Sequence, residues 1–165
     1  MALHIFTDGS VNTQSKVGYG AYLAVTDLST SIDSLKDKVR VRRFEQTSST
    51  RLELQTLLWA LSDLSVLINN HDMVLTVYTD SQNIIDLPKR QAQLEQNNYL
   101  SSKNRQLNHC EMYQEFYQIT SKPNYQFVKV KGHQPFQHKN EIDMLFSLVD
   151  KSSRRAMRKA LDTVN

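Results

Sequence analysis

Apolar residues recur along this chain with two different periods, and these periods predict strands and helices in a definite order. Five segments are rich in aliphatic, β-branched and aromatic residues, which favour strands. These segments are residues 3–8, 18–25, 38–44, 73–80 and 125–130. Leucines at helical spacing predict a long helix over residues 50–68, and weaker patterns predict helices over 106–120 and from 140 onward. A short helix from Ser81 is expected to stop at Pro88, because proline lacks a backbone N–H group.

The order of these elements predicts an α/β protein with one mixed sheet. The first three strands are joined by short connections, which favours an antiparallel meander. The later strands are separated by helices, and such crossovers favour parallel pairing. Residues 26–37 and 89–105 are polar and predict connecting segments, and residues 132–139 predict a loop before the final helix.

Composition narrows the functional classes. A length of 165 residues suits one domain, and we expect a single domain over residues 1–165 with a basic helical tail from about residue 151. No apolar run approaches the roughly 20 residues of a membrane span, and no signal-peptide pattern opens the chain. The single cysteine, Cys110, excludes an internal disulfide and favours the cytoplasm. The net charge of +3 is consistent with a polyanionic partner.

Four acidic residues fall at the ends of predicted elements. Asp8 and Asp80 each follow an apolar strand, whereas Glu53 and Asp143 lie in the first turns of helices. Each has an ordinary structural explanation. Asp8 is explained by a turn and Asp80 by an N-cap of the helix that follows. Glu53 is explained by a capping box with Thr50, and Asp143 by the helix dipole. If the fold brings them to one edge of the sheet, their charges repel one another unless a cation is bound. Carboxylates suit Mg²⁺, and two such ions can activate a water and stabilise the leaving oxygen of a phosphodiester.

Six short motifs occur in an order that resembles the type 1 ribonuclease H family, and the resemblance covers residues 3–149. The motifs are Phe6-Thr7-Asp8-Gly9-Ser10, Gly18-Tyr19-Gly20-Ala21, Leu52-Glu53-Leu54, Tyr78-Thr79-Asp80-Ser81-Gln82, Val130-Lys131-Gly132-His133 and Ile142-Asp143-Met144-Leu145. The resemblance implies the ribonuclease H-like fold, a five-stranded mixed sheet with its first three strands antiparallel and helices on both faces. It also implies that Glu53 reaches the sheet edge, which spacing alone left open.

By this resemblance, the chain is an endonuclease that hydrolyses the RNA strand of RNA–DNA hybrids and leaves 3′-hydroxyl and 5′-phosphate ends. The implied catalytic and metal-binding residues are Asp8, Glu53, Asp80 and Asp143. The implied cofactor is a pair of Mg²⁺ ions, with Mn²⁺ as an alternative. His133 matches the family's mobile catalytic histidine, which moves protons or assists product release. We expect a monomer whose partner is the hybrid and not a membrane.

The resemblance also implies substrate contacts near the acids. Gly9, Ser10 and Gln82 match positions that contact the minor groove, where the 2′-hydroxyl distinguishes RNA from DNA. Asn12, in the turn that follows, is a looser candidate. Each of these residues is expected to lie beside the cleaved strand.

Three features depart from the family pattern. Ser48, Ser49 and Thr50 stand in the stretch before Glu53 where the family typically has asparagines, so the pocket for a phosphate of the DNA strand is expected to have a different geometry. Residues 89–105 carry four cations but no tryptophan, unlike the basic protrusion with which several family members grip the hybrid. Asn140 lies three residues before Asp143, whereas the family spacing is four.

Two other functions remain open from the sequence. A 3′–5′ exonuclease of the same fold would carry Asp-x-Glu on its first strand, and Asp8-Gly9-Ser10 argues against it. A hybrid-binding protein with weak or no catalysis remains the alternative. The basic tail after Asp150 is either a nucleic-acid contact or a solvated helix face.

Overall fold

A five-stranded mixed sheet forms the centre of this computed structural model, which describes residues 1–70, 72–122, 124–131 and 140–164. Its strand order is β3-β2-β1-β4-β5. The first three strands pair antiparallel, and β4 pairs in parallel with both β1 and β5, so the predicted mixed sheet is confirmed. The strands are β1 (Ala2–Asn12), β2 (Val17–Val25), β3 (Arg40–Phe44), β4 (Val74–Thr79) and β5 (Tyr125–Lys129).

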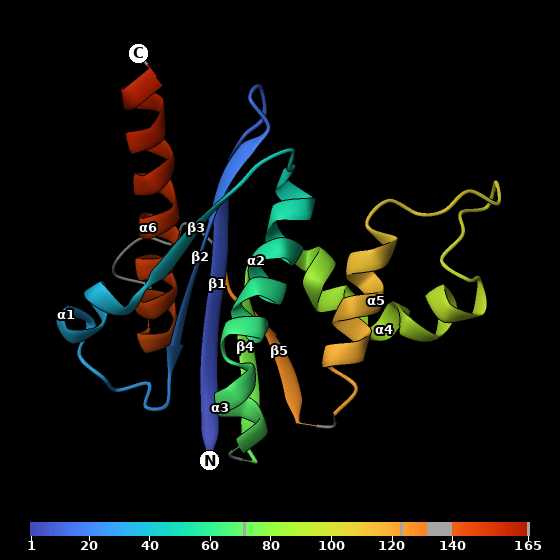
Figure 1. Ribbon diagram of the computed structural model, residues 1–165. Helices are drawn as coiled ribbons and strands as arrows, with labels where there is room; N and C mark the ends of the chain where they lie inside the picture. Colours follow the sequence, from blue (N-terminus) through green and yellow to red (C-terminus); the bar gives the residue numbers. More distant parts are fainter. Residues whose placement is uncertain (71, 123, 132–139, 165) are drawn as a thin grey trace.

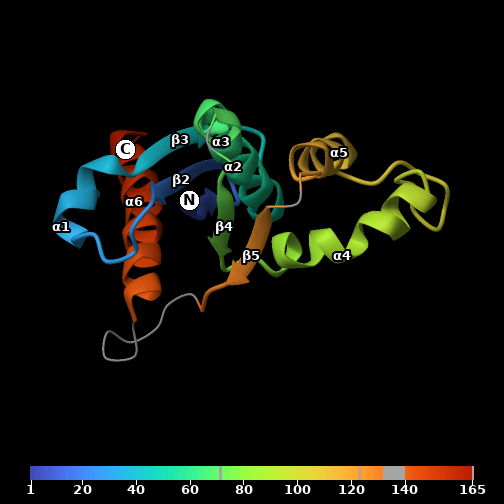
Figure 2. The ribbon, with the colours of Figure 1, turned by 90° about the horizontal axis from the view of Figure 1, so that it is seen from below.

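Helices cover both faces of the sheet (Figures 1 and 2). The longer ones are α2 (Ser49–Asp63), α4 (Gln82–Gln96), α5 (Cys110–Ile119) and α6 (Glu141–Val164). A short helix, α3 (Ser65–Asn70), follows α2 and completes the segment predicted as one helix. The polar connection after β2 contains α1 (Ile32–Leu35) and one 3₁₀ turn, η1 (Lys36–Lys38).

The alternation of side chains along β1 divides the core into two halves. Leu3 and Ile5 are fully buried on the face that packs against α2, α4 and α5. Phe6 points to the opposite face, where it packs against Leu145 and Val149 of α6. Because successive side chains of a strand point to opposite faces, Asp8 lies on the α6 side of the sheet.

The parallel register of β1 and β4 sets two acids at one level. Phe6 pairs with Tyr78, and two residues further along each strand stand Asp8 and Asp80. At this point β4 ends while β1 continues to Asn12. Side chains from both faces of the sheet can therefore meet beyond the end of β4.

The first turns of α2 lie unusually close to β1. A Cβ atom on Gly9 would stand 2.8 Å from Cδ2 of Leu52, which is closer than real side chains approach. A side chain at residue 9 would therefore have to displace the buried Leu52, and glycine avoids this where α2 sits close over the sheet. Glu53 follows Leu52 directly and is carried to the same edge.

One predicted boundary is wrong, because α4 continues through Pro88 for eight further residues to Gln96. Proline removes the backbone hydrogen bond to Ile84, which costs stability in a helix interior. Burial offsets this cost, since Ile84 and Leu87 are 0% exposed and Leu94 is 6% exposed.

Within the described parts of the chain, no helix is both long enough and apolar enough to cross a membrane.

Candidate active site

A small recess opens between β1 and β4 at the level where β4 ends. Its walls include the acids Asp8, Glu53 and Asp80, and three threonines complete the lining. The acids come from β1, from α2 and from the turn that leads from β4 into α4. The structure thus brings together three of the four acids that the sequence identifies as metal ligands.

Glu53 is free to reach the recess because another residue caps its helix. The N-cap of α2 is Ser48, whose hydroxyl accepts a hydrogen bond from the backbone N–H of Arg51. The predicted capping box that begins at Thr50 is therefore wrong. The Glu53 carboxylate instead accepts a hydrogen bond of 2.6 Å from the hydroxyl of Ser81.

The surroundings of Glu53 act on its pKa in opposite directions. Burial raises the pKa of Glu53, the hydrogen bond from Ser81 lowers it, and the nearby charge of Asp80 raises it again. The balance is an increase in pKa. Positive charge entering the recess would favour the ionised form of Glu53.

Asp80 is likewise not the cap of its helix. Ser81 is the N-cap of α4, and its hydroxyl accepts a hydrogen bond from the backbone N–H of Ile84. The same hydroxyl donates to Glu53, so Ser81 connects the start of α4 to α2. The N–H of Ser81 donates to the hydroxyl of Thr79, which fixes the turn that presents Asp80.

Asp8 has the most perturbed acidity of the site, because the pKa of its carboxyl rises to about 8. Burial is the largest cause, and the charge of Asp80 is the second. A side-chain hydrogen bond with Asp150 raises the pKa further, and the backbone N–H of Gly9 acts against these effects. Without a cation nearby, the raised pKa favours the protonated form of Asp8 at neutral pH, and this form can donate a hydrogen bond to Asp150.

Asp150 therefore takes the place beside Asp8 that sequence analysis assigned to Asp143. It lies in the middle of α6 and is 21% exposed in its side chain. Its Oδ1 atom also pairs with Nε of Arg154 at 3.0 Å, one helical turn further along. Ser153 adds a second contact between α6 and β1, because its hydroxyl lies 3.1 Å from that of Ser10.

Asp143 has a structural role at the start of α6. Its backbone N–H donates to Oδ1 of Asn140, and the N–H of Asn140 donates back to Oδ2 of Asp143. This reciprocal pair satisfies two donors at the helix terminus. Asp143 and Asp150 are seven residues apart, which places them on one side of α6 but about 10 Å apart along its axis.

The donor set of the recess fits a hard divalent cation. All four acids that meet or adjoin it, Asp8, Glu53, Asp80 and Asp150, offer only oxygen ligands, which Mg²⁺ prefers. Within the described residues, no three His, Cys, Asp or Glu side chains stand close enough to enclose an ion as they are. A cation that entered the recess would attract the ionised carboxylates and favour their approach to it.

Comparison with protein-family models shows which family the chain belongs to. The sequence model of RNase H matches residues 1–150. The chain belongs to the RNase H family. The family resemblance predicted from the six motifs is thereby confirmed. No curated protein sequence gives a significant match.

Solved structures share the fold of this RNase H at low sequence identity. The RNase H domain of prototype foamy virus is 18% identical, with a TM-score of 0.71 over 93% of this chain and 92% of the viral one. LC11-RNase H1, isolated from compost by a metagenomic approach, is 18% identical, with a TM-score of 0.62 over 94% and 98% of the two chains. A foamy viral protease-reverse transcriptase in complex with double-stranded DNA is 13% identical, with a TM-score of 0.66 over 92% and 94%.

The other predicted site residues of this RNase H are placed as follows. His133 lies outside the described residues. Ser10 and Asn12 lie on β1 beyond Asp8, and Oδ1 of Asn12 accepts two backbone hydrogen bonds within the following turn. Gln82 is exposed at the start of α4, where its side chain accepts from Lys129 at 2.6 Å and donates to Asp86 at 2.9 Å.

The start of α2 carries the exposed Ser49 and Thr50 and faces a residue that sequence analysis did not identify. Nη1 of Arg51 lies 3.5 Å from Nδ1 of His109, and both residues line a groove of about 330 Å³. Burial and the charge of Arg51 both lower the pKa of His109. The two residues are 58 positions apart, so no local pattern could have paired them.

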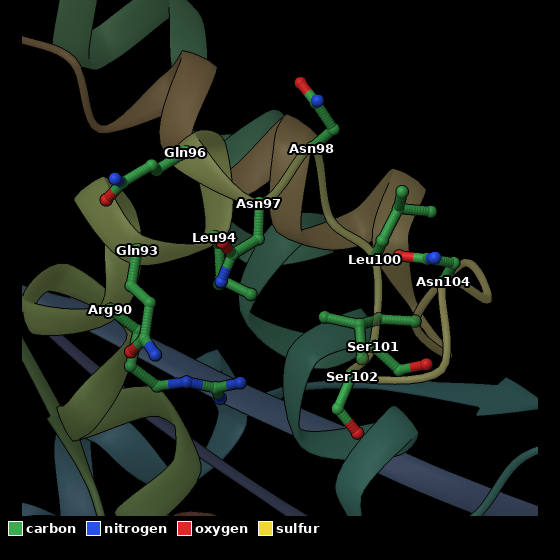
Figure 3. A pocket seen from close by; sticks show the side chains of 11 residues that line it. Arg90, Gln93, Leu94, Gln96, Asn97, Asn98, Leu100, Ser101, Ser102 and Asn104 are labelled. Carbon is green, nitrogen blue, oxygen red and sulfur yellow. The ribbon is translucent and has the colours of Figure 1, made fainter.

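Residues 89–105, for which the sequence leaves open weaker or differently placed substrate gripping and a solvated polar loop, form a protrusion on the opposite side of the molecule from α6 (Figures 1 and 2). It holds a groove of about 650 Å³ lined mainly by amides and hydroxyls (Figure 3). One of its cations is held by the protein, because the guanidinium of Arg90 lies 5.7 Å from the ring centre of Tyr113. Tyr99 is only 8% exposed and belongs to the hydrophobic cluster on the face of the sheet covered by α2, α4 and α5.

Proposed function

We propose that this RNase H is an endonuclease that hydrolyses the RNA strand of RNA–DNA hybrids and leaves 3′-hydroxyl and 5′-phosphate ends. Its proposed metal ligands are Asp8, Glu53, Asp80 and Asp150, which would hold two Mg²⁺ ions, or Mn²⁺ in their place. Asp143 is the competing candidate for the fourth ligand. His133 remains the candidate for proton transfer or product release.

One observation carries the proposal, namely the meeting of these acids from separate elements around a buried aspartate. Burying several carboxylates together costs free energy, and the raised pKa values of Asp8 and Glu53 record that cost. Two serines, Ser48 and Ser81, perform the capping work that would otherwise occupy the acids. This expense is consistent with a catalytic use of the recess rather than a structural one.

The side chains divide the chemical work. When bound, the metal ions supply an activated water and stabilise the charge on the leaving oxygen. Ser81 orients Glu53 through a hydrogen bond to Oε2, and Arg154 orients Asp150 through Oδ1. Asp8 releases a proton from its carboxyl as positive charge enters the recess, because that charge favours its ionised form.

The proposed substrate contacts lie around this recess. The backbone of Gly9 and Ser10 and the side chain of Gln82 would meet the minor groove, with Asn12 further along β1. Ser49 and Thr50, beside the Arg51–His109 pair, would meet a phosphate of the DNA strand. Hydroxyls and a cation at an α-helix N-terminus suit such an anion.

A side-by-side cleavage assay tests the proposal. Labelled RNA–DNA hybrid, duplex RNA and duplex DNA are incubated with the protein, with and without Mg²⁺. We expect metal-dependent internal cleavage of the RNA strand in the hybrid only, and none with Asp80→Asn. Cleavage without metal, or of the duplexes at the same rate, would contradict the proposal.

The second candidate is a hybrid-binding protein with weak or no catalysis. The departures at Ser49 and Thr50 favour it, because they alter the place where the DNA strand is positioned. Hybrid binding without turnover at saturating Mg²⁺ would establish this alternative.

A further inference from the structure

The second half of α6 extends well past the candidate active site. After Asp150 the helix runs a further fourteen residues to Val164, which corresponds to about 21 Å. The hydroxyl contact between Ser153 and Ser10 sets the beginning of this extension beside β1. The extension therefore starts next to the part of β1 where substrate contacts are proposed.

The positive charge of the protein is concentrated in this extension. Residues 151–164 hold five cations and one acid, a charge of +4, whereas the whole chain carries +3. The rest of the chain thus has a charge of −1, and four of its acids, Asp8, Glu53, Asp80 and Asp150, lie at or beside the recess. A polyanion that reaches the recess meets negative side chains there, so a nearby cationic surface would have to attract it.

Helical spacing sorts the residues of the extension into rows. Residues four apart lie along one row. The first row, Val149, Ser153 and Met157, is buried against the sheet, with exposures of 0%, 0% and 9%. The next row around the helix begins with Asp150 and continues with Arg154 and Arg158.

A third row lies further from the recess. It contains Lys151, Arg155 and Lys159, all exposed. The helix therefore presents two cationic rows with different relations to the site. The row of Arg154 and Arg158 continues directly from a proposed metal ligand, whereas the row of Arg155 is turned about 100° away from it.

We propose that Arg154 and Arg158 bind the phosphate backbone of the nucleic acid beyond the cleavage position, so that α6 supplies both a metal ligand and a backbone clamp. The inference rests on the proposed function for its substrate. Arginine suits the role because its guanidinium can bind a phosphate through two hydrogen bonds. The exposed Arg158 is the residue to test, since Arg154 also holds Asp150.

The test compares Arg158→Ala with Arg155→Ala. Both variants remove one exposed arginine from the same helix, so they change the net charge equally. Both are placed on an Asp80→Asn background, and binding of a short fluorescent RNA–DNA hybrid is measured by anisotropy over a range of KCl concentrations. Circular dichroism checks that α6 remains folded in each variant.

We expect Arg158→Ala to weaken binding by about 5- to 10-fold at moderate salt and to reduce the salt slope by about 1. Arg155→Ala should change both quantities much less. Equal effects of the two variants would show a general charge effect and overturn the proposal, as would no effect of either, or no binding by the parent protein.

These outcomes are separate from the test of the proposed function. If the wild type does not cleave the hybrid but its binding depends on Arg158, the proposed nuclease activity is refuted and the proposed backbone clamp is supported. If the wild type cleaves the hybrid but Arg158→Ala leaves the salt dependence of binding unchanged, the nuclease activity is supported and the backbone clamp is refuted.

Discussion

Different kinds of residue cap the helices of the site: serines cap α2 and α4, whereas Asn140 and Asp143 cap α6. At α2 and α4 a serine hydroxyl receives the first backbone N–H groups, through Ser48 and Ser81. At α6 the acid itself takes part in capping, because the side chains of Asn140 and Asp143 each accept a hydrogen bond from the other residue's backbone N–H. Glu53 and Asp80 therefore reach the recess, while Asp143 is engaged at its own helix terminus.

This difference shows when an acid at a helix start is available for chemistry. A carboxylate near an N-terminus is favoured there by the helix dipole whether or not it has a function. It is released for a neighbouring site only when another side chain satisfies the free N–H groups. At α6 the acid that reaches Asp8 comes instead from two turns further along, at Asp150.

The largest effect is expected for the acids that the comparison describes as released. Asp80→Asn should lower hybrid cleavage by about a thousandfold or more, because losing a metal ligand removes several kcal/mol of transition-state stabilisation. The cleavage rate at saturating Mg²⁺ measures this, and urea unfolding serves as the control for the fold. Activity near wild type in a folded Asp80→Asn protein would break the comparison.

The two capping serines should differ in their effect on activity. Ser81→Ala removes the hydrogen bond that orients Glu53, so cleavage should fall by about 10- to 100-fold, in the range for residues that support metal ligands. Ser48→Ala should leave the rate within about twofold. Each variant should lose about 1 kcal/mol of unfolding free energy, because each removes an N-cap.

Measuring rates and urea stabilities for both serine variants sharpens the comparison. Equal losses of activity would show that capping alone matters and that the Ser81–Glu53 hydrogen bond does not contribute to catalysis. Ser81→Thr provides a further control, since it keeps the hydroxyl.

A further effect, on stability rather than on activity, concerns protonation of Asp8 in protein freed of metal by a chelator. Its pKa is about 8 in the folded state, against 3.8 for the free side chain. The folded state therefore binds more protons than the unfolded state between these values, so its stability must fall as pH rises from about 4 to about 8. The neutral variant Asp8→Asn lacks this dependence.

Urea denaturation at several pH values measures the difference. We expect the stability advantage of Asp8→Asn over wild type to grow as pH rises and to level off above about 8. A constant difference across this range would contradict the raised pKa. In the wild type, Mg²⁺ should reverse the trend, because bound cations favour the ionised carboxylate.

The fold was largely predictable because alternation and helical spacing are local signals. The strand ends at Asp8 and Asp80 followed from apolar runs that stop at an acid. The direction of α2 is a property of packing, so only the family resemblance placed Glu53 at the edge. The length of α4 was missed because buried leucines on both sides of Pro88 outweigh the lost hydrogen bond.

Asp150, which the structure places beside Asp8, could not be predicted from the sequence for a different reason. It lies inside a helix and next to a segment rich in cations. An acid in that position has the same sequence pattern as an ordinary solvent-exposed helix residue that pairs with neighbouring cations. Asp143 stands at an element end, which is the signal that identified the other three acids. The two share one side of α6, and the choice between them depends on how far the helix has slid along β1, which is set by contacts such as Ser10 with Ser153.

We propose that Asp150, and not Asp143, completes the metal site. Isothermal titration of Mg²⁺ into wild type, Asp150→Asn and Asp143→Asn tests it most directly, with the fold checked by circular dichroism. We predict that Asp143→Asn binds Mg²⁺ as the wild type does, whereas Asp150→Asn loses at least about 10- to 100-fold in affinity. Weakened binding in Asp143→Asn together with unchanged binding in Asp150→Asn would contradict the account.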